Sequence, residues 1–595
     1  MVEFRTPGGE EIADDGGPIG LALTGGGLKA SLFHIGVLAR LAELDLLRRI
    51  DVISGTSGGA LIAALYHLRL KRALDADGDI DTDRLIRMVA ALESDFLKVA
   101  AIDLRAKLFE NPLANLKRTS PQRSSAARFA DLLERHFFRP IWTGGPNEPI
   151  EMRDLLIHPR GDLDFNPIIE NPRRYCKAPE LIINAANLAT GQGWRFDARC
   201  MGEPTTGPAS RSLSAAPRLV RTPYHRLPEA FASLSLGQAV AASMAIPGLL
   251  EPLHFHRLYP EPGRKGKFLD LRLQDGRYAD VLGTEALRAR GCARLIIGDA
   301  SGFDASHDRR RRIQLESLEA RRPGSAVLIH MLSEIETPEI KPISKGGSGH
   351  VVKDRTDKEV TSYGIERRTQ KLIAGMRTDL DAPSEIEALS VMADGYLIAK
   401  RAFQRHWQRG QAWAEGSPQQ SDAWRFTAVI EALRQPSKQM VKHLSASRLS
   451  AFSAPRLAVG RMFELGLLAV VAMLTAAALL SFWSAIRPEA DADGLWLLAT
   501  IGFSMLTAWL VGRRQRAVSV TTAGHAQFGW IDRAQAIVMA LPLALGARFR
   551  RRTSRTFLRA GRIRNIDIKP ITIEKRRKVR LDQTEPAAQT ERKAA

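Results

Sequence analysis

The stretch Asp51–Leu70, DVISGTSGGALIAALYHLRL, decides the fold class of this 595-residue chain. Its apolar start predicts a short buried strand, and Ala60–Leu70 has the apolar spacing of a helix. Between them Gly55-Thr56-Ser57-Gly58-Gly59 forms a G-x-S-x-G pattern at a strand-to-helix junction. Glycines there permit a sharp turn and leave space around the serine. The pattern predicts a nucleophilic Ser57; the alternative is an ordinary glycine-rich turn.

A second strand-to-helix junction lies upstream. The apolar strand Pro18–Thr24 runs directly into Gly25-Gly26-Gly27, and apolar residues then recur at helical spacing from Leu32 to Leu46. Consecutive glycines at a helix start expose backbone amides, which suits an oxyanion or a phosphate. The phosphate-loop pattern is absent, because Lys29 is followed by alanine. The two junctions together predict an α/β fold with both glycine-rich turns at the carboxyl edge of a parallel sheet.

Three blocks downstream complete a family pattern. They are Leu181–Phe196, which has the pattern of a strand and turn, Ala239–Pro252 (AVAASMAIPGLLEP), and Asp275-Gly276. With the glycine loop and the serine turn, they make residues 18–302 resemble the patatin-like phospholipases. The resemblance implies a three-layer α/β/α core with a mainly parallel sheet. Two positions depart from the family pattern: Ala30 stands where a glycine is usual, and Arg277 replaces the second small residue after the aspartate.

The resemblance also implies a catalytic site that needs neither a cofactor nor a metal. Its parts would be a Ser–Asp dyad and an oxyanion hole made of backbone amides. The implied nucleophile is Ser57, the general base Asp275, and the oxyanion-hole residues Gly25, Gly26, Gly27 and Gly58. Lys29 and Arg277 are further candidates for substrate binding, and the guanidinium group of Arg277 could contact an anionic head group. The expected reaction is hydrolysis of carboxyl esters of phospholipids or other lipids through an acyl-enzyme.

Three alternatives stay open at this point. The first is a Ser–Asp–His triad, because His307, His330 and His350 follow Asp275 in the chain. The second is a catalytically silent membrane organiser, for which Ala30 and Arg277 are the relevant departures. The third is a lipid acyltransferase, which would share the acyl-enzyme and differ in the acceptor. The early position of Ser57, on what reads as the second strand, favours the dyad over the triad.

A length of 595 residues predicts more than one domain. The three cysteines fit neither a disulfide framework nor a zinc pattern, and the polar N-terminus lacks the features of a signal peptide, so we expect the catalytic part in the cytoplasm. No pattern indicates an oligomeric state. The expected organisation is a flexible arm (1–17), a catalytic domain with helical insertions (18–435), a linker (436–461), a transmembrane helical hairpin (462–512) and a basic cytoplasmic tail (513–595).

The hairpin is predicted from two apolar runs. Phe463–Trp483 has 21 residues with a single charge, Glu464, at its edge, and Leu495–Gly512 has none. Each run is long enough to cross a bilayer, and tryptophans lie near the ends, where interfacial aromatics belong. The loop Ser484–Gly494 is acidic, whereas both outer flanks are basic. The positive-inside rule therefore places the catalytic domain and the C-terminus on the cytoplasmic side of the inner membrane.

The tail supplies much of the net charge of +21. Arg548–Arg580 holds 14 Lys or Arg residues against Asp567 and Glu574. A polybasic segment beside a membrane helix is attracted to anionic lipids. We therefore expect the tail to bind anionic membrane lipids and not to form part of the fold, with no specific nucleic-acid partner. The alternatives are a solvated disordered tail and non-specific nucleic-acid binding; lipid is favoured because the segment is predicted to be tethered beside a bilayer.

Overall fold

The computed structural model describes only part of the chain. The described residues are 17–116, 124–142, 148–204, 219, 221–247, 249–255, 257–259, 268–269, 271–301, 311, 313–317, 325–331, 360–408, 421–448, 544–549, 551–552 and 554–566. The predicted hairpin, most of the predicted arm, and His307 and His350 lie outside these ranges. In the described ranges no helix combines the length and the apolar character needed to cross a membrane.

One mixed sheet organises the described residues. Five parallel strands lie in the order β10-β9-β1-β2-β3, and β4, β5 and β6 continue the sheet beyond β3 with antiparallel pairing. The parallel core predicted from the two glycine-rich junctions is confirmed. The bounds of these strands are β1 Ile19–Leu23, β2 Ile50–Thr56, β3 Glu180–Asn187, β4 Gly193–Phe196, β5 Cys200–Gly202, β6 Thr222–Pro223, β9 Arg294–Asp299 and β10 Ala326–His330.

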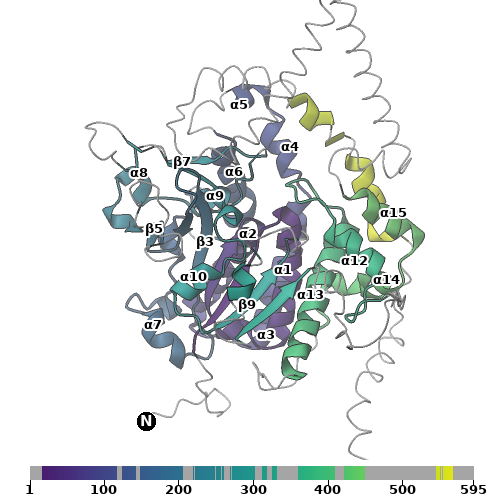
Figure 1. The fold of residues 1–595 in the computed structure, drawn as a ribbon, viewed down its shortest axis with the longest axis horizontal. Helices are drawn as coiled ribbons and strands as arrows, with labels where there is room; N and C mark the ends of the chain where they lie inside the picture. Colours follow the sequence, from purple (N-terminus) through teal and green to yellow (C-terminus); the bar gives the residue numbers. More distant parts are fainter. Residues whose placement is uncertain are drawn as a thin grey trace, which may run out of the picture.

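The helices that follow the first two strands begin at the glycine-rich turns. Helix α1 (Gly27–Glu43) follows β1, and α2 (Gly58–Asp77) follows β2, as the sequence predicts. Helix α13 (Glu385–Gln408) lies beside α1 (Figure 1). Glycine permits this close approach, because a Cβ on Gly36 would lie 1.9 Å from the Met392 carbonyl oxygen. Helix α3 (Thr82–Ala100) also packs against α1, so this face of the sheet carries the larger core.

The other face of the sheet carries a thinner layer. Alternate strand residues such as Ala22, Val52 and Ile297 pack there against the short helix α10 (Thr284–Ala289). Since successive side chains of a strand point to opposite faces, both faces need an apolar cover. The three-layer α/β/α core is therefore confirmed, with its layers unequal in size.

A second group of helices packs near strands β3, β7 (Leu253–Phe255) and β8 (Leu271–Asp275). Helix α6 (Ser125–Leu133) packs against α9 (Leu236–Ser243), which ends inside the Ala239–Pro252 block. Phe129 and Leu133 are fully buried, so α6 belongs to the core. The remaining helices are α4 Leu104–Phe109, α5 Pro112–Leu116, α7 Pro167–Glu170, α8 Glu229–Ala232, α12 Arg367–Ala374 and α14 Ile430–Arg434.

Parts of the predicted linker and tail are folded onto the domain, which corrects the sequence-based boundaries. Helix α15 (Lys438–Ala446) lies within the predicted linker, yet its Met440 and Leu444 are buried. Tail residue Phe557 stacks on His443 of α15, with 4.1 Å between ring centroids. In Figure 1 the yellow C-terminal segment lies beside α15 and reaches α4. The expectation that residues 548–580 form no part of the fold is therefore wrong for the described residues up to Ile566.

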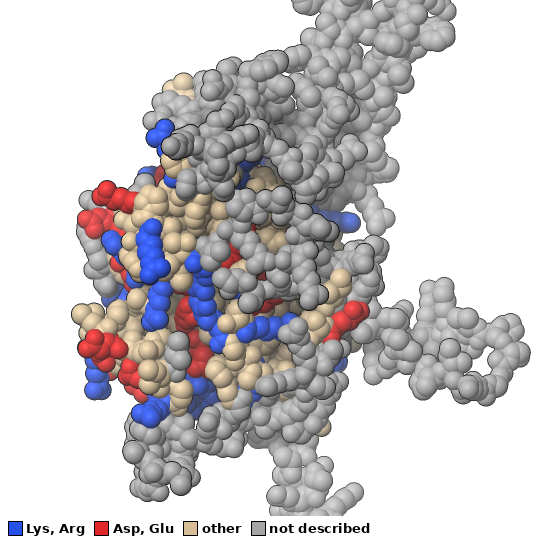
Figure 2. Space-filling view, turned by 60° about the vertical axis from the view of Figure 1, so that its left-hand side comes forward, with Lys and Arg blue, Asp and Glu red and all other residues tan. Residues whose placement is uncertain are grey.

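The surface of the domain carries charges of both signs. On the face shown in Figure 2, basic and acidic side chains are interspersed among uncharged residues. The described residues on that face therefore combine charges of both signs. The dense basic run lies instead in the C-terminal segment.

Candidate active site

Ser57 occupies the tight turn between β2 and α2. Its backbone has φ +52° and ψ −124°, a conformation that a residue with a side chain rarely adopts. The neighbouring glycines are required by close contacts: a Cβ on Gly59 would lie 2.1 Å from the Leu23 carbonyl oxygen. A Cβ on Gly55 would lie 2.6 Å from the Ala60 Cα atom. The strained turn predicted from the G-x-S-x-G pattern is present.

Asp275 reaches Ser57 through the sheet. Strand β2 pairs with β3 and ends at Thr56, opposite Asn184. The next residue of β3, Ala185, pairs with Asp275 at the end of strand β8 (Leu271–Asp275), which runs antiparallel to β3. Strand β8 itself pairs with β7 (Leu253–Phe255). Strand β2 therefore pairs with β3 as far as Asn184, and β8 pairs with β3 from Ala185 onward. The ends of β2 and β8 meet at this point of β3.

The two candidate catalytic side chains are buried and poised toward each other. Ser57 and Asp275 are each 1% exposed. In the described structure neither Ser57 Oγ nor Asp275 Oδ2 makes a hydrogen bond of ordinary geometry. Burial raises the pKa of Asp275 to about 6, while the Arg277 amide and the nearby Ser57 hydroxyl lower it by less. A carboxylate with a raised pKa is a stronger base than a solvated one.

The glycine loop lies against Ser57. A Cβ on Gly25 would lie 2.8 Å from the Ser57 Cβ atom, and a Cβ on Gly58 would lie 2.0 Å from the Gly27 carbonyl oxygen. Gly26 and Gly27 have φ of +148° and +60°, which favours glycine at both positions. Among the described residues, no acceptor is found for the amides of Gly25, Gly26, Gly27 or Gly58. The four predicted oxyanion-hole residues are therefore brought together.

A hydrogen-bond chain from the Ala239–Pro252 block supports the serine turn. Ser243 Oγ accepts from the Ser57 amide at 2.8 Å and donates to the Asn184 carbonyl oxygen at 2.6 Å. The Asn184 side chain donates in turn to Ser54 Oγ at 2.8 Å and to the Gly55 carbonyl oxygen at 3.1 Å. Sequence reasoning missed both Ser243 and Asn184 as positioning residues. The available signal was the location of Ser243 inside the quoted block.

His330 belongs to a different cluster. It ends β10, three strand spacings from β2 in the sheet order, a separation of roughly 14 Å. Its Nε2 atom lies 3.7 Å from Asp299 Oδ2, and Arg311 donates to the same carboxylate at 2.6 Å. Asp299 Oδ1 also accepts, at 3.5 Å, from Thr24, which precedes the glycine loop. Of the three histidines considered for a triad, the one that the structure describes is thus engaged away from Ser57.

The two candidate substrate-binding residues differ in their placement. Lys29 is 4% exposed and donates to the Ala374 carbonyl oxygen at 2.8 Å, and burial lowers its pKa to about 8. Its expected role in substrate binding is wrong, because its ammonium group is used inside the fold. Arg277 is half-buried, and its amide donates to Asp275 Oδ1 at 3.0 Å, so it lies beside the site. Among the described residues no cluster of metal-ligating side chains is found.

Comparison with known proteins agrees with this geometry. Residues 21–287 match the family model for patatin-like phospholipases. Over 58 residues the chain is 50% identical to triacylglycerol lipase 4 of Saccharomyces cerevisiae, a match that covers 10% of this chain and 6% of the yeast protein. The match therefore spans a small part of that relative.

Two solved structures show weaker likeness. Human GIVD cytosolic phospholipase A2 aligns at 15% identity and a TM-score of 0.30, covering 72% of this chain and 60% of that one. VipD from Legionella pneumophila aligns at 11% identity and a TM-score of 0.28, covering 91% of this chain and 95% of VipD. Scores this low carry no argument about activity.

Proposed function

Taking residues 21–287 as a patatin-like phospholipase domain, we propose that the protein is a serine lipid acyl hydrolase that cleaves carboxyl esters of phospholipids or related lipids. The observation that carries the proposal is the pairing of Ser57 and Asp275. Both side chains are buried, each keeps an oxygen without an ordinary hydrogen bond, and the glycine loop lies against the serine. Unsatisfied buried oxygens are costly, and a reacting site is one reason to retain them.

In the proposed first step, Asp275 accepts the hydroxyl proton of Ser57 while Ser57 Oγ attacks the ester carbonyl carbon. The carbonyl oxygen becomes an oxyanion, which the amides of Gly25, Gly26, Gly27 and Gly58 are placed to stabilise. Collapse of this intermediate breaks the bond to the alcohol, which leaves with the proton from Asp275. The acyl group then remains esterified to Ser57.

In the second step, water attacks the acyl-enzyme. Asp275 removes a proton from the water, the same amides hold the second oxyanion, and Ser57 leaves with the proton from Asp275. The free fatty acid is released and the enzyme returns to its starting state. The raised pKa of Asp275 supports this double role, because a carboxyl group whose pKa is about 6 both accepts and returns a proton readily near neutral pH.

The dyad is preferred to a triad because of where His330 lies. Its neighbours are Asp299 and Arg311, and burial together with Arg311 lowers its pKa to about 4. A proton relay needs the base within hydrogen-bond reach of the serine. The junction of β2 and β8 brings the Asp275 carboxyl close enough to Ser57 for the serine hydroxyl to lower its pKa, which supports a mechanism without imidazole.

Covalent labelling with a fluorophosphonate tests the proposed nucleophile. The wild-type chain and the variant Ser445→Ala, which changes an exposed serine of α15, should both be labelled. The variant Ser57→Ala should lose the label, because no hydroxyl remains at the turn. Labelling that persists undiminished in Ser57→Ala would reject the proposal, and failure of the wild type to label or hydrolyse any ester would favour the silent organiser.

The proposed location is the inner membrane, with the catalytic domain and the C-terminus facing the cytoplasm. The support is the pair of apolar runs, the acidic loop between them and the basic residues on both outer flanks. Cysteines introduced at Ala490 and Ala594 should differ in their reaction with an impermeant maleimide on intact cells. We expect labelling at residue 490 alone; equal labelling, or labelling only at residue 594, would contradict the topology.

A further inference from the structure

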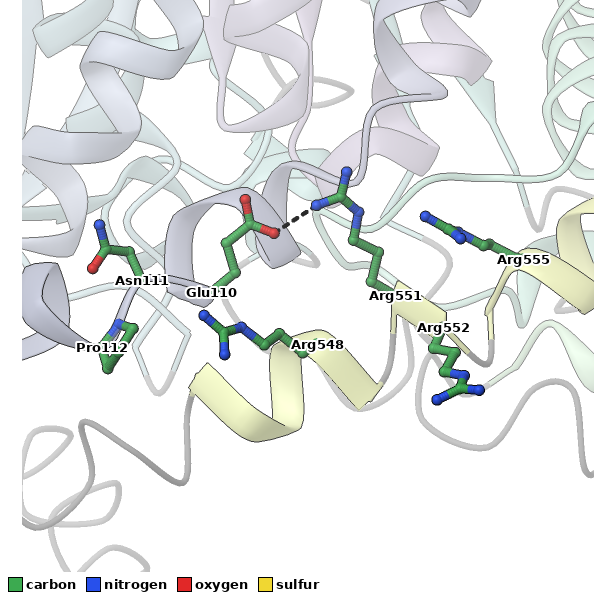
Figure 3. A pocket seen from close by; sticks show the side chains of 7 residues that line it. All are labelled: Glu110, Asn111, Pro112, Arg548, Arg551, Arg552 and Arg555. Atoms are coloured by element: carbon green, nitrogen blue, oxygen red, sulfur yellow. Dashed lines mark hydrogen bonds and ion pairs between the residues drawn. The ribbon is translucent and has the colours of Figure 1, made fainter.

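An arginine-lined hollow lies between the C-terminal segment and the end of α4. It has a volume of about 900 Å³ and is lined by Arg548, Arg551, Arg552 and Arg555 together with Glu110, Asn111 and Pro112. In Figure 3 Arg551 donates to Glu110, Arg548 lies below Glu110, Arg555 lies beside Arg551, and Arg552 points away from this pair. The distance between Arg551 Nη1 and Glu110 Oε2 is 2.7 Å. We call this feature the arginine hollow.

The lining of the arginine hollow is not neutralised by its own residues. Among the residues that line the hollow there are four guanidinium groups and one carboxylate, which contacts Arg551, and all four arginines are exposed. Their spacing of three, one and three residues is that of one helix face, which concentrates the charge on one side of the segment. Like charges held together in this way repel one another, and an anion relieves the repulsion. Guanidinium groups bind phosphate oxygens with paired hydrogen bonds, so a phosphate is the best-matched ligand.

Exposed apolar side chains are close in the chain to residues that line the hollow: Leu113 follows Pro112, Phe549 follows Arg548, and Leu545 lies three residues before Arg548. Leu545 and Phe549 on the C-terminal segment are 54% and 62% exposed, and Leu113 on α5 is 67% exposed. These three are among nine large apolar residues that are exposed in the described part of the chain. Apolar side chains next to a basic cluster are typical of surfaces that enter the head-group region of a bilayer. This combination favours a lipid surface over a nucleic acid.

We propose that the arginine hollow binds the phosphate groups of anionic phospholipids, with Leu113, Leu545 and Phe549 entering the boundary between head groups and acyl chains. The proposal deepens the membrane-facing part of the proposed function and does not depend on catalysis. It replaces a diffuse attraction of the whole basic tail with a defined site built from two segments of the fold.

The arginine hollow is connected to the glycine loop through α4. Glu110 follows the last residue of α4, and Arg105 near the start of that helix pairs with Asp379. The Asp379 carbonyl oxygen accepts from the Leu28 amide at 3.3 Å, directly after the glycine loop. Since α4 has six residues, its two ends lie roughly 9 Å apart. The hollow and the backbone beside the glycine loop are therefore linked through one short helix and the Asp379 contact.

A fluorescent probe at residue 549 tests the proposal in the full chain. The Phe549→Cys variant, made with Cys200→Ser and Cys292→Ser so that only buried Cys176 remains, carries an environment-sensitive dye. The protein is reconstituted in phosphatidylcholine bilayers with increasing phosphatidylglycerol and with brominated lipids as quenchers. We expect quenching that rises with the phosphatidylglycerol content and that is weak in phosphatidylcholine alone.

Two triple variants separate the site from total charge. The first variant combines Arg548→Gln, Arg552→Gln and Arg555→Gln. It should weaken the affinity for phosphatidylglycerol bilayers, measured by the quenching of the dye, by roughly fivefold for each arginine removed. Arg559→Gln, Arg562→Gln and Arg564→Gln remove the same charge from exposed positions outside the hollow and should leave most of the response. Equal losses in the two variants would overturn the proposal.

Further arms identify the source of the anion. Inorganic phosphate alone should not reproduce the change in dye fluorescence, and short single-stranded DNA should not bind in an arginine-dependent way. A response to free phosphate without one to lipid, or a DNA affinity lost only in the first triple variant, would overturn the lipid assignment. Because none of these readouts involves hydrolysis, they stand apart from any failure of the proposed activity.

Discussion

The catalytic edge of the sheet and the C-terminal arginine segment achieve specificity in opposite ways. At the catalytic edge the important residues are buried and mostly uncharged, and glycines allow backbone segments to approach within van der Waals limits. In the C-terminal segment the important residues are exposed and charged, and a few buried apolar side chains such as Phe557 attach the segment to the domain. Close steric contacts determine the backbone conformation at the catalytic edge, whereas the concentration of positive charge determines what the C-terminal segment attracts. The two regions should therefore respond differently to mutation, pH and lipid.

The largest expected effect is the loss of the base at the catalytic edge. Asp275→Asn should lower kcat for a soluble ester by roughly 10³–10⁴-fold, because an amide cannot accept the serine proton. His330→Gln should reduce it by less than about tenfold if the protein stays folded, because no step of the proposed mechanism passes through imidazole. The measurement is steady-state hydrolysis, with circular dichroism to confirm folding. A folded and inert His330 variant would overturn the dyad.

A substitution in the glycine loop tests the steric part of the comparison. Gly25→Ala would place a Cβ 2.8 Å from the Ser57 Cβ atom, so the loop or the serine must shift. We expect kcat to fall by about 10²–10³-fold, the loss typical of a displaced oxyanion-hole donor. Gly193→Ala is the matched control, because its Cβ would meet nothing closer than 3.8 Å. Equal activity of the two variants would show that the loop does not hold the oxyanion.

Helix α15 tests whether the C-terminal region is folded or merely connects other parts. Leu444 is 1% exposed, so Leu444→Ala should lower the free energy of unfolding by about 2–5 kcal/mol. Lys442→Ala, an exposed position on the same helix, should change it by no more than about 0.5 kcal/mol. Urea denaturation measures both. Indifference of stability to Leu444→Ala would restore the view of this region as a linker.

The pH dependence should differ between activity and stability. Activity depends on ionised Asp275, so kcat/KM should rise as the pH increases through about 6 and then level off. The free energy of unfolding should fall as the pH increases, because a raised pKa means that the folded state holds the proton more tightly than the unfolded state. The stability contributed by protonated Asp275 is lost as the pH rises from about 4 to about 6.

The variant Asp275→Asn isolates this contribution. Relative to the wild type it should be more stable above pH 6, by at most about 3 kcal/mol, with the difference disappearing near pH 4. Unfolding curves of both proteins at the two pH values provide the measurement. A variant less stable than the wild type at pH 7 would show that Asp275 is ionised in a favourable environment and would contradict its raised pKa.

Much of the catalytic edge was predictable because its requirements are local. The glycines at residues 25–27 and around Ser57 mark turns that other residues cannot form, and apolar periodicity marks the flanking strands and helices. The register that brings Asp275 beside Ser57 was not predictable from spacing. It depends on β8 joining β3 at Ala185, after a segment that contains several other elements.

By itself the sequence determined the β1–α1–β2–α2 unit, the strained serine turn and the dense positive charge near the C-terminus. Only the tertiary structure decided which charged groups are used inside the fold and which stay available. Lys29 reads as a site residue, yet it lies against a carbonyl group 345 positions away, and Arg551 gains its partner Glu110 across 441 positions. The physical reason is that backbone sterics act between neighbours in the chain, whereas burial and charge pairing depend on whatever the fold brings alongside.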